Sequence, residues 1–264
     1  MSIITLLTDF GSSSPYAAQM KAVLLGLCRA TIVDITHDAP PHDITHAAYL
    51  LRAAAPAFPA GTIHLAVVDP GVGTPRQPLA VASGGQFFVG PDNGLLGPAA
   101  RALGQARAFV IDVDRFARRP LSSTFHGRDV FAPVAAALAN GLPIEAVGPP
   151  AASLVELPWE PAARGPGWLR GRLLYCDRFG NLVTNIPGTW LNDVPRRLIL
   201  QSPRGRIPIR RGRTYADGAE GAPVAIVGSD GMVEIAVFAG RAAEALGLEA
   251  GDELVLSFTS NPSS

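Results

Sequence analysis

Short apolar runs alternate with helix-like stretches through the first half of the chain. The runs are bounded by turn residues, which is typical of buried strands. They lie at residues 3–8, 31–35, 62–68, 79–90 and 107–113, and the fourth comprises two strands around the turn Ser83-Gly84-Gly85. Stretches between them favour helices, at residues 15–28, 46–55, 94–103 and 129–140. This alternation predicts an α/β domain with a largely parallel, helix-covered sheet.

The expected helices have recognisable ends. Ser14 and Pro15 are predicted as N-cap and first residue of the first helix, and Asp43 as the cap of the second. Gly141 should end the helix that begins at Asp129. These signals fix where the helices leave the loops that follow the strands.

The pattern changes where Pro and Gly gather, at residues 145–167. Short strands follow, which predict a small all-β barrel or sandwich. They are expected at 168–176, 182–187, 197–201, 206–210, 223–228, 232–238 and 253–258, with one helix at 240–246. The interpretation is an N-terminal α/β domain at 1–155, a linker at 156–167 and a C-terminal β domain at 168–264.

Composition describes an ordinary globular protein. Of 264 residues, 48% are hydrophobic and 17% charged, with 22 acidic and 22 basic side chains. Such a balance gives no global field for nucleic acid or an anionic membrane. Residues 196–213 hold seven Arg and no acid, which suits a phosphate or RNA patch. The alternation in 206–212 favours a half-exposed strand instead, and the stretch has no aromatic residue for base stacking.

Cysteine content and the N-terminus indicate a cytoplasmic protein. Cys28 and Cys176 are far apart and form no CxxC motif or Cys/His cluster, so neither a disulfide framework nor a zinc site is expected. No signal peptide is visible before the first strand, and no apolar run approaches the ~18 residues of a membrane span.

Polar residues follow three neighbouring strands. Asp9 ends the first strand, His37 and Asp38 follow the second, and Asp69 ends the third. Ligands of open parallel sheets bind at these carboxyl ends. Each Asp by itself suits a turn or a helix cap. Together they suggest a rim of acceptors for hydroxyl groups or for a cationic ligand.

Two loops near this rim contain further polar residues. Arg76 lies seven residues after Asp69, beyond a Gly-rich turn that lacks the spacing of a phosphate-binding loop. His126 directly precedes a helix, whose positive end disfavours the imidazolium. His126 suits a base or an ordinary loop residue equally. The metalloprotease and serine-hydrolase motifs are absent from the sequence.

The second domain contains two further candidate segments. The segment 177-DRFGNLVTNI-186 suits either a hairpin turn with Phe179 in the core or a site where Phe179 stacks on a base and Asn181 reads its edge or the sugar. In 229-SDGMVEIAV-237, Glu234 interrupts an apolar strand. A carboxylate there is costly unless paired, and a ligand ammonium would pair it.

Seven segments together resemble the S-adenosylmethionine hydroxide adenosyltransferases, hydrolase relatives of the fluorinase and chlorinase. They are LTDFG, DITH, VVDPGVGTPR, GPDNGLL, TFHGRD, DRFGNLVTNI and GSDGMVEIAV, in this order along the chain. The resemblance implies an α/β domain followed by a β-barrel, in a homotrimer with the ligand between neighbouring subunits. It implies that S-adenosylmethionine is the substrate, that water converts it to adenosine and methionine, and that no cofactor or nucleic acid takes part.

The resemblance also implies roles for single residues. Asp69, Arg76 and His126 would position the water. The residues implied in substrate binding are Asp9, Asp69, Asp177, Phe179, Asn181, Ser229, Glu234 and Val237. Two positions depart from the family pattern: His42 stands where many members have Gln, and Asp230 replaces a small residue. A halide-using enzyme of the same fold, which would lack the Asp-Arg-His set, and a nonenzymatic sensor of the same ligand are the alternatives.

This chemistry accounts for an arginine placed across a turn from a carboxylate. Methionine leaves a sulfonium as a neutral thioether, so the reaction needs an oxygen nucleophile held in line, and no acid. Without a metal ion to lower the pKa of water, fixed charge must do so. Arg76 would favour the anionic form of the water, while Asp69 and His126 accept its protons.

Overall fold

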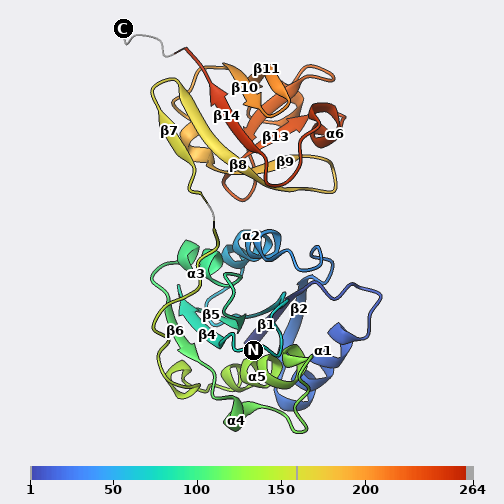
Figure 1. Cartoon of the computed structure of the whole chain (residues 1–264), viewed down its shortest axis with the longest axis vertical. Coiled ribbons are helices and arrows are strands. Elements are labelled where there is room, and N and C mark those ends of the chain that lie inside the picture. Colours follow the sequence, from blue (N-terminus) through green and yellow to red (C-terminus); the bar gives the residue numbers. More distant parts are fainter. Residues whose placement is uncertain (1, 159, 260–264) are drawn as a thin grey trace. The chain divides into compact units, whose positions relative to one another are not determined.

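The computed structural model describes residues 2–158 and 160–259 (Figure 1). The chain divides into two compact units, Met1–Pro158 and Trp159–Ser264, a boundary inside the predicted linker. The outermost residues of the predicted domains (1 and 260–264) and linker residue 159 lie outside the described part. None of the helices in the described part is long and apolar enough to cross a membrane.

The first unit is built on a six-stranded sheet with the order β2-β1-β3-β5-β4-β6. Its strands are β1 (Ser2–Thr8), β2 (Ala30–Thr36), β3 (Ile63–Val67), β4 (Pro78–Ser83), β5 (Gln86–Pro91) and β6 (Arg107–Val110). The pairs β2-β1, β1-β3 and β3-β5 are parallel, and β4 is antiparallel to both of its neighbours. The largely parallel sheet is therefore confirmed, with one antiparallel hairpin.

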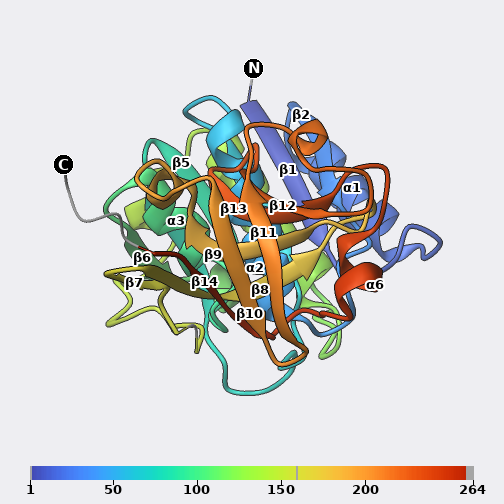
Figure 2. The ribbon, with the colours of Figure 1, turned by 90° about the horizontal axis from the view of Figure 1, so that it is seen from above.

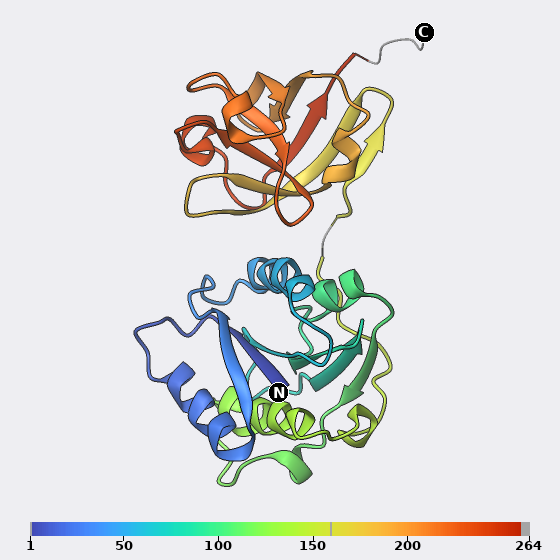
Figure 3. The ribbon, with the colours of Figure 1, turned by 180° about the vertical axis from the view of Figure 1, so that it is seen from behind.

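Helices cover both faces of this sheet (Figures 1 and 3). The helices α1 (Tyr16–Leu27) and α5 (Ala132–Ala139) share one face, and α2 (Ile44–Ala54) and α3 (Gly97–Leu103) share the other. Side chains alternate along β1 accordingly. Ile4 and Leu6 belong to the core that holds α1 and α5, whereas Leu7 belongs to the core of α2 and α3. The strands β1 and β3 are buried because helices cover both faces, whereas the edge strand β2 has no fully buried residue.

Helix ends agree only in part with the sequence. Asp43 caps α2 as expected, accepting the backbone N–H of His46 at 2.9 Å. The predicted Ser14 cap is wrong: the N-cap is Pro15, and the Ser14 hydroxyl donates to the Gly11 carbonyl. The predicted strand 107–113 ends at Val110, because Asp112 caps the short helix α4 (Val113–Phe116). The helix expected from Asp129 begins as a π-turn, η2 (Gly127–Phe131), before α5.

The second unit is a closed seven-stranded β-barrel, seen from above in Figure 2. Its strands are β8 (Trp168–Cys176), β9 (Leu182–Pro187), β10 (Arg197–Ser202), β11 (Gly205–Arg211), β12 (Pro223–Val227), β13 (Met232–Val237) and β14 (Glu253–Ser257). Closure comes from β14, which pairs with both β10 and β8. The predicted helix at 240–246 is α6 (Ala242–Leu246). All seven predicted strands are present.

One part of the predicted linker is structured. Residues Ala163–Gly165 form β7, which pairs antiparallel with the start of β8. The Pro and Gly content of this segment led to the prediction of a linker where the structure has a three-residue strand paired with β8. Such a strand is too short to show an alternating pattern.

A buried histidine network lies between the sheet and α2. His64 on β3 is fully buried. Its Nδ1 lies 2.7 Å from the Thr5 hydroxyl and its Nε2 lies 2.8 Å from Oε1 of Gln86. Burial lowers the pKa of His64 below its usual range, opposed by the bond to Gln86. The imidazole is therefore neutral in the folded protein.

This network predicts acid sensitivity. The unfolded state binds a proton at His64 near pH ~6.5 and the folded state binds it only at lower pH, so stability is full above that value and is lost as the pH falls through the lowered pKa. We expect the free energy of unfolding to fall by up to ~1.4 kcal/mol per pH unit in this range. Urea unfolding, followed by helical circular dichroism at several pH values, measures it.

His64→Gln is the control for that prediction, because it removes the titrating group and leaves the other histidines in place. The variant should show a shallower pH dependence than the wild type. Parallel pH profiles for the two proteins would show that His64 stays uncharged in both states or is not the responsible group.

Candidate active site

Asp69, Arg76 and His126 form one hydrogen-bonded network. Asp69 accepts two bonds from Arg76, from Nε at 3.0 Å to Oδ1 and from Nη2 to Oδ2. The same Nη2 lies 3.0 Å from Nδ1 of His126, fifty residues further along the chain. The Asp69 and Arg76 side chains are 5% and 11% exposed. Arg76 also lies over the Phe131 ring, 5.2 Å from its centroid, so the guanidinium is fixed on three sides.

Two loops bring these residues together. Asp69 follows β3, and the turn of residues 69–74 carries the chain back so that Arg76 faces it. At Gly73 this turn lies against the loop before His126: a Cβ there would be 2.8 Å from the Ser123 carbonyl oxygen, and φ is +79°. A glycine is required because both the conformation and the close approach exclude a side chain.

A buried carboxylate holds the second loop. Asp129 is 1% exposed, forms a two-point ion pair with the neighbouring Arg128, and accepts the backbone N–H of Ser122 at 3.0 Å. Asp129 keeps a pKa below its usual range despite burial, because of Arg128 and the Ser122 N–H. It therefore ties both ends of the segment 122–129 and positions His126 between them.

The contact with Arg76 fixes the tautomer of His126. A guanidinium can only donate, so Nδ1 of His126 is the acceptor and a neutral ring carries its proton on Nε2. Burial lowers the pKa of His126, and the charge of Arg76 lowers it further, against the carboxylates of Asp69 and Asp129. The expected neutral ring is supported, but for reasons other than the helix dipole. The expectation that His126 accepts a proton from water does not fit, because its acceptor nitrogen is occupied.

A cavity of about 340 Å³ opens beside this network. It is lined by Asp9, Phe10, Tyr16, Pro41, His42, Val67, Asp69, Val72, Thr124, Phe125, His126 and Gly127. Three predicted polar residues, Asp9, Asp69 and His126, thus share one cavity at the carboxyl ends of β1 and β3. Its volume lies in the range of small-molecule sites.

Sequence reasoning missed the aromatic part of this cavity. Phe10, Tyr16 and Phe125 meet edge to face, with ring centroids 5.3–5.8 Å apart. Each is next to a signal that the sequence did show, because Phe10 follows Asp9, Tyr16 opens α1 and Phe125 precedes His126. Such a cluster gives an apolar wall that can exclude water from a reacting carbon.

The other strand-end residues have structural partners. Asp9 accepts the backbone N–H of His42 at 2.9 Å, with His42 in a left-handed conformation at φ +64°. Asp38 accepts the backbone N–H of Ser12. His37 is buried, with Nδ1 2.9 Å from the Thr8 hydroxyl and Nε2 3.1 Å from Asp34. Asp9 and His42 line the cavity, whereas His37 and Asp38 do not.

In the second unit, Asp177 organises the segment that follows β8. Its Oδ1 accepts the backbone N–H groups of Phe179 and Asn181 at 2.8 Å, and its Oδ2 accepts Nδ2 of Asn181 at 2.9 Å. The Phe179 side chain is 77% exposed on this turn. The hairpin turn is thus real. However, Phe179 points to solvent and is not part of the core, which leaves its ring available to a ligand.

Glu234 is the unusual group of the barrel. It is 7% exposed and its Oε1 has no hydrogen-bond partner. Burial raises the pKa of this carboxyl, and so do the charges of Asp177 and Asp230, against a contact with Tyr215. Ser229 is exposed in the turn before β13, and Val237 is buried at its end. A buried carboxyl group with one oxygen unpaired, near two other carboxylates, suits a cationic ligand group.

Comparisons with known proteins agree on one family. Residues 4–148 match the SAM hydroxide adenosyltransferase N-terminal domain and residues 171–255 match the C-terminal domain. A protein of Thermus thermophilus named (R)-S-adenosyl-L-methionine hydrolase is 44% identical, over 94% of this chain and 96% of its own. One of Salinispora tropica with the same name is 42% identical, over 95% and 96%.

More distant relatives and a solved structure extend the comparison. A protein of Actinoplanes sp. named fluorinase is 27% identical over 94% of this chain and 95% of its own. The crystal structure of an uncharacterized conserved protein from Thermotoga maritima is 35% identical, covers 97% of this chain and 100% of its own, and superposes with a TM-score of 0.91.

Proposed function

The chain belongs to the SAM hydroxide adenosyltransferase family, and on this premise we propose that it hydrolyses S-adenosyl-L-methionine to adenosine and L-methionine. The observation that carries the proposal is that Asp69 and His126 lie at the wall of a cavity with an apolar side and are joined by Arg76, which is not itself a lining residue. In the reaction a C–O bond forms at the ribose 5′ carbon as the C–S bond breaks. The electron pair stays on sulfur and the water gives up a proton.

The network suits an oxygen nucleophile. Arg76 provides fixed positive charge and His126 provides an N–H donor at Nε2, and both favour an anionic oxygen over neutral water. Asp69 is the acceptor left for the proton, because each carboxylate oxygen can accept a second bond beside that from Arg76. We therefore assign Arg76 and His126 to holding the nucleophile and Asp69 to receiving its proton.

The same network speaks against halide as the nucleophile. Asp69 can accept a proton from water, whereas a halide ion has no proton to give and would be repelled by this carboxylate. Incubation with S-adenosylmethionine, with and without added chloride, followed by identification of the nucleoside, tests the function. Adenosine in both samples supports hydrolysis. A halogenated nucleoside would favour the halide enzyme, and no turnover with intact binding would favour a sensor.

The substrate-binding residues are assigned to both units. Asp9 and Asp69 in the first unit, with Asp177, Phe179 and Asn181 in the second, would hold the nucleoside. Ser229 and Glu234 would hold the amino-acid end, with Val237 closing that end. We further propose a cytoplasmic homotrimer in which these two sets of residues come from neighbouring subunits. Light scattering of the purified protein would test the trimer.

The reaction is expected to need no metal ion. Among residues 2–158 and 160–259, no group of three His, Cys, Asp or Glu side chains is arranged to hold one. The charged network takes the place that a metal would have in activating water. Turnover should stay unchanged after treatment with EDTA and after addition of Mg²⁺ or Zn²⁺. A rate that disappears with EDTA and returns with one ion would contradict this mechanism.

Ligand binding should depend on the barrel. Asn181→Ala and Glu234→Ala should each weaken binding of S-adenosylmethionine by about 1–3 kcal/mol, because each leaves a polar ligand group unpaired. Calorimetry measures this, and Glu253→Ala, at an exposed carboxylate on β14, is the control. Unchanged affinity in Asn181→Ala and Glu234→Ala, with the fold intact by circular dichroism, would place the ligand elsewhere.

A further inference from the structure

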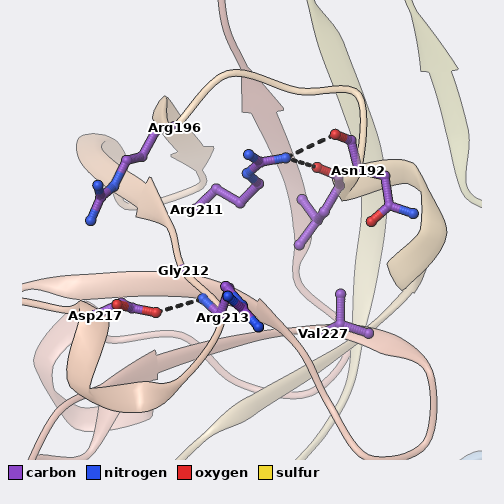
Figure 4. Close-up of a pocket in the computed structure, with 8 residues that line it drawn as sticks. Asn192, Arg196, Arg211, Gly212, Arg213, Asp217 and Val227 are labelled. Carbon is purple, nitrogen blue, oxygen red and sulfur yellow. Dashed lines mark hydrogen bonds between the residues drawn. The ribbon is translucent and has the colours of Figure 1, made fainter.

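The barrel carries an arginine-rich cavity of about 650 Å³ (Figure 4). It is lined by Leu191, Asn192, Arg196, Arg211, Gly212, Arg213, Asp217 and Val227. None of these residues has a part in the hydrolysis proposed above. The three arginines come from the stretch 196–213, whose unusual charge that function leaves unexplained.

One of the three guanidinium groups is held in place by the backbone. Nη1 of Arg211 donates to the carbonyls of Leu191 at 2.8 Å and Asn192 at 2.9 Å, as Figure 4 shows. Its Nε and Nη2 have no hydrogen bond to the part of the chain that the structure describes, nor have the guanidiniums of Arg196 and Arg213. These donors are therefore available to a ligand.

The cavity keeps most of its positive charge. Its lining includes one carboxylate, Asp217, whose Oδ2 accepts the backbone N–H groups of Arg213 at 2.7 Å and Thr214 at 3.0 Å. These backbone bonds are the main reason why the pKa of Asp217 is below its usual range. Asp217 shapes the η5 turn (Tyr215–Asp217). The charge of Arg196 also lowers the pKa of Asp217, but no ion pair joins Asp217 to the three arginines in the described part. Three arginines less one aspartate leave a formal charge of +2.

We propose that this cavity binds a phosphorylated small molecule, with its dianionic phosphoryl group held by Arg196, Arg211 and Arg213. A guanidinium group can donate two parallel hydrogen bonds to two phosphate oxygens. Near pH 7 a phosphoryl group carries the negative charge that would balance the positive lining. The cavity exceeds what a bare phosphate ion needs and lies in the range of small-molecule sites. Val227, 45% exposed, and Leu191 give an apolar surface for the remainder of the ligand.

The proposal is tested with phenyl phosphate and phenyl sulfate by calorimetry at pH 7.5, at low salt and without phosphate buffer. Neither probe contains a nucleoside, so the result is independent of the proposed hydrolysis. Phenyl phosphate should bind more tightly than the singly charged sulfate ester. The double variant Arg196→Gln/Arg213→Gln should weaken phenyl phosphate about tenfold or more, because two charged hydrogen-bond donors are lost.

The control removes the same charge from the same stretch. Arg206 and Arg210 are exposed and do not line the cavity, so Arg206→Gln/Arg210→Gln should bind phenyl phosphate like the wild type. Equal weakening in both double variants would overturn the proposal in favour of a diffuse field. The proposal would also fail if the two esters bound equally or if phenyl phosphate did not bind. A short RNA that bound in a parallel titration in which phenyl phosphate did not bind would likewise overturn it.

Discussion

Arg76→Ala is expected to lower the turnover of S-adenosylmethionine by about 10²–10³ while leaving the affinity for adenosine nearly intact. Loss of one preorganised charged group typically has an effect of this size. In the proposed roles Arg76 touches the nucleophile and not the nucleoside, so the binding of adenosine does not depend on it. Steady-state kinetics and adenosine calorimetry on the same preparation separate the two effects.

Arg76→Lys is the matched variant for this prediction. It keeps the charge but cannot make the two bonds to Asp69 together with the bond to His126, so it should restore only part of the rate. Asp69→Ala should differ from both, because it leaves Arg76 unpaired and removes a proposed ribose contact, so rate and adenosine affinity should both fall. Wild-type turnover in Arg76→Ala would show that the network does not hold the nucleophile.

His126→Ala is expected to lower turnover by a similar factor of about 10²–10³, through loss of the Nε2–H donor. Because Nδ1 is occupied by Arg76, the two conservative variants should differ. Glutamine places its amide near the position of Nε2 and should restore part of the rate. Asparagine, which is shorter and can replace only the Nδ1 contact, should not.

The pH profile gives a second measure of the same role. Protonation of His126 would put a hydrogen on Nδ1, facing the Arg76 donor, and would break the network. Since the pKa of His126 is lowered in the folded protein, turnover should be full above the usual histidine range and should be lost only as the pH falls through the lowered value. A rate that rises on acidification, or equal rates in the Gln and Asn variants, would contradict the donor role.

Much of the fold could be predicted because its signals are local. The strands at 3–8 and 182–187 are marked by apolar residues that are close together in the chain. The Asp43 cap bonds to His46, only three residues away. The β7 strand and the Ser14 hydroxyl show the limit of such signals. A three-residue strand has no period, and a serine before a helix can bond to the preceding loop instead.

The two kinds of domain and the polar residues at the strand ends could be predicted from the sequence pattern, and the resemblance added their roles. Which of these residues meet depends on tertiary packing. Asp69, Asp9 and His126 share one cavity, whereas His37 turns to Thr8 and Asp34. The tautomer of His126 follows from Arg76, fifty residues away, and that contact requires two loops to pack at Gly73. Periodicity and turn chemistry act between near neighbours in the chain, but the partner of a buried polar group is set by loops that converge from distant segments.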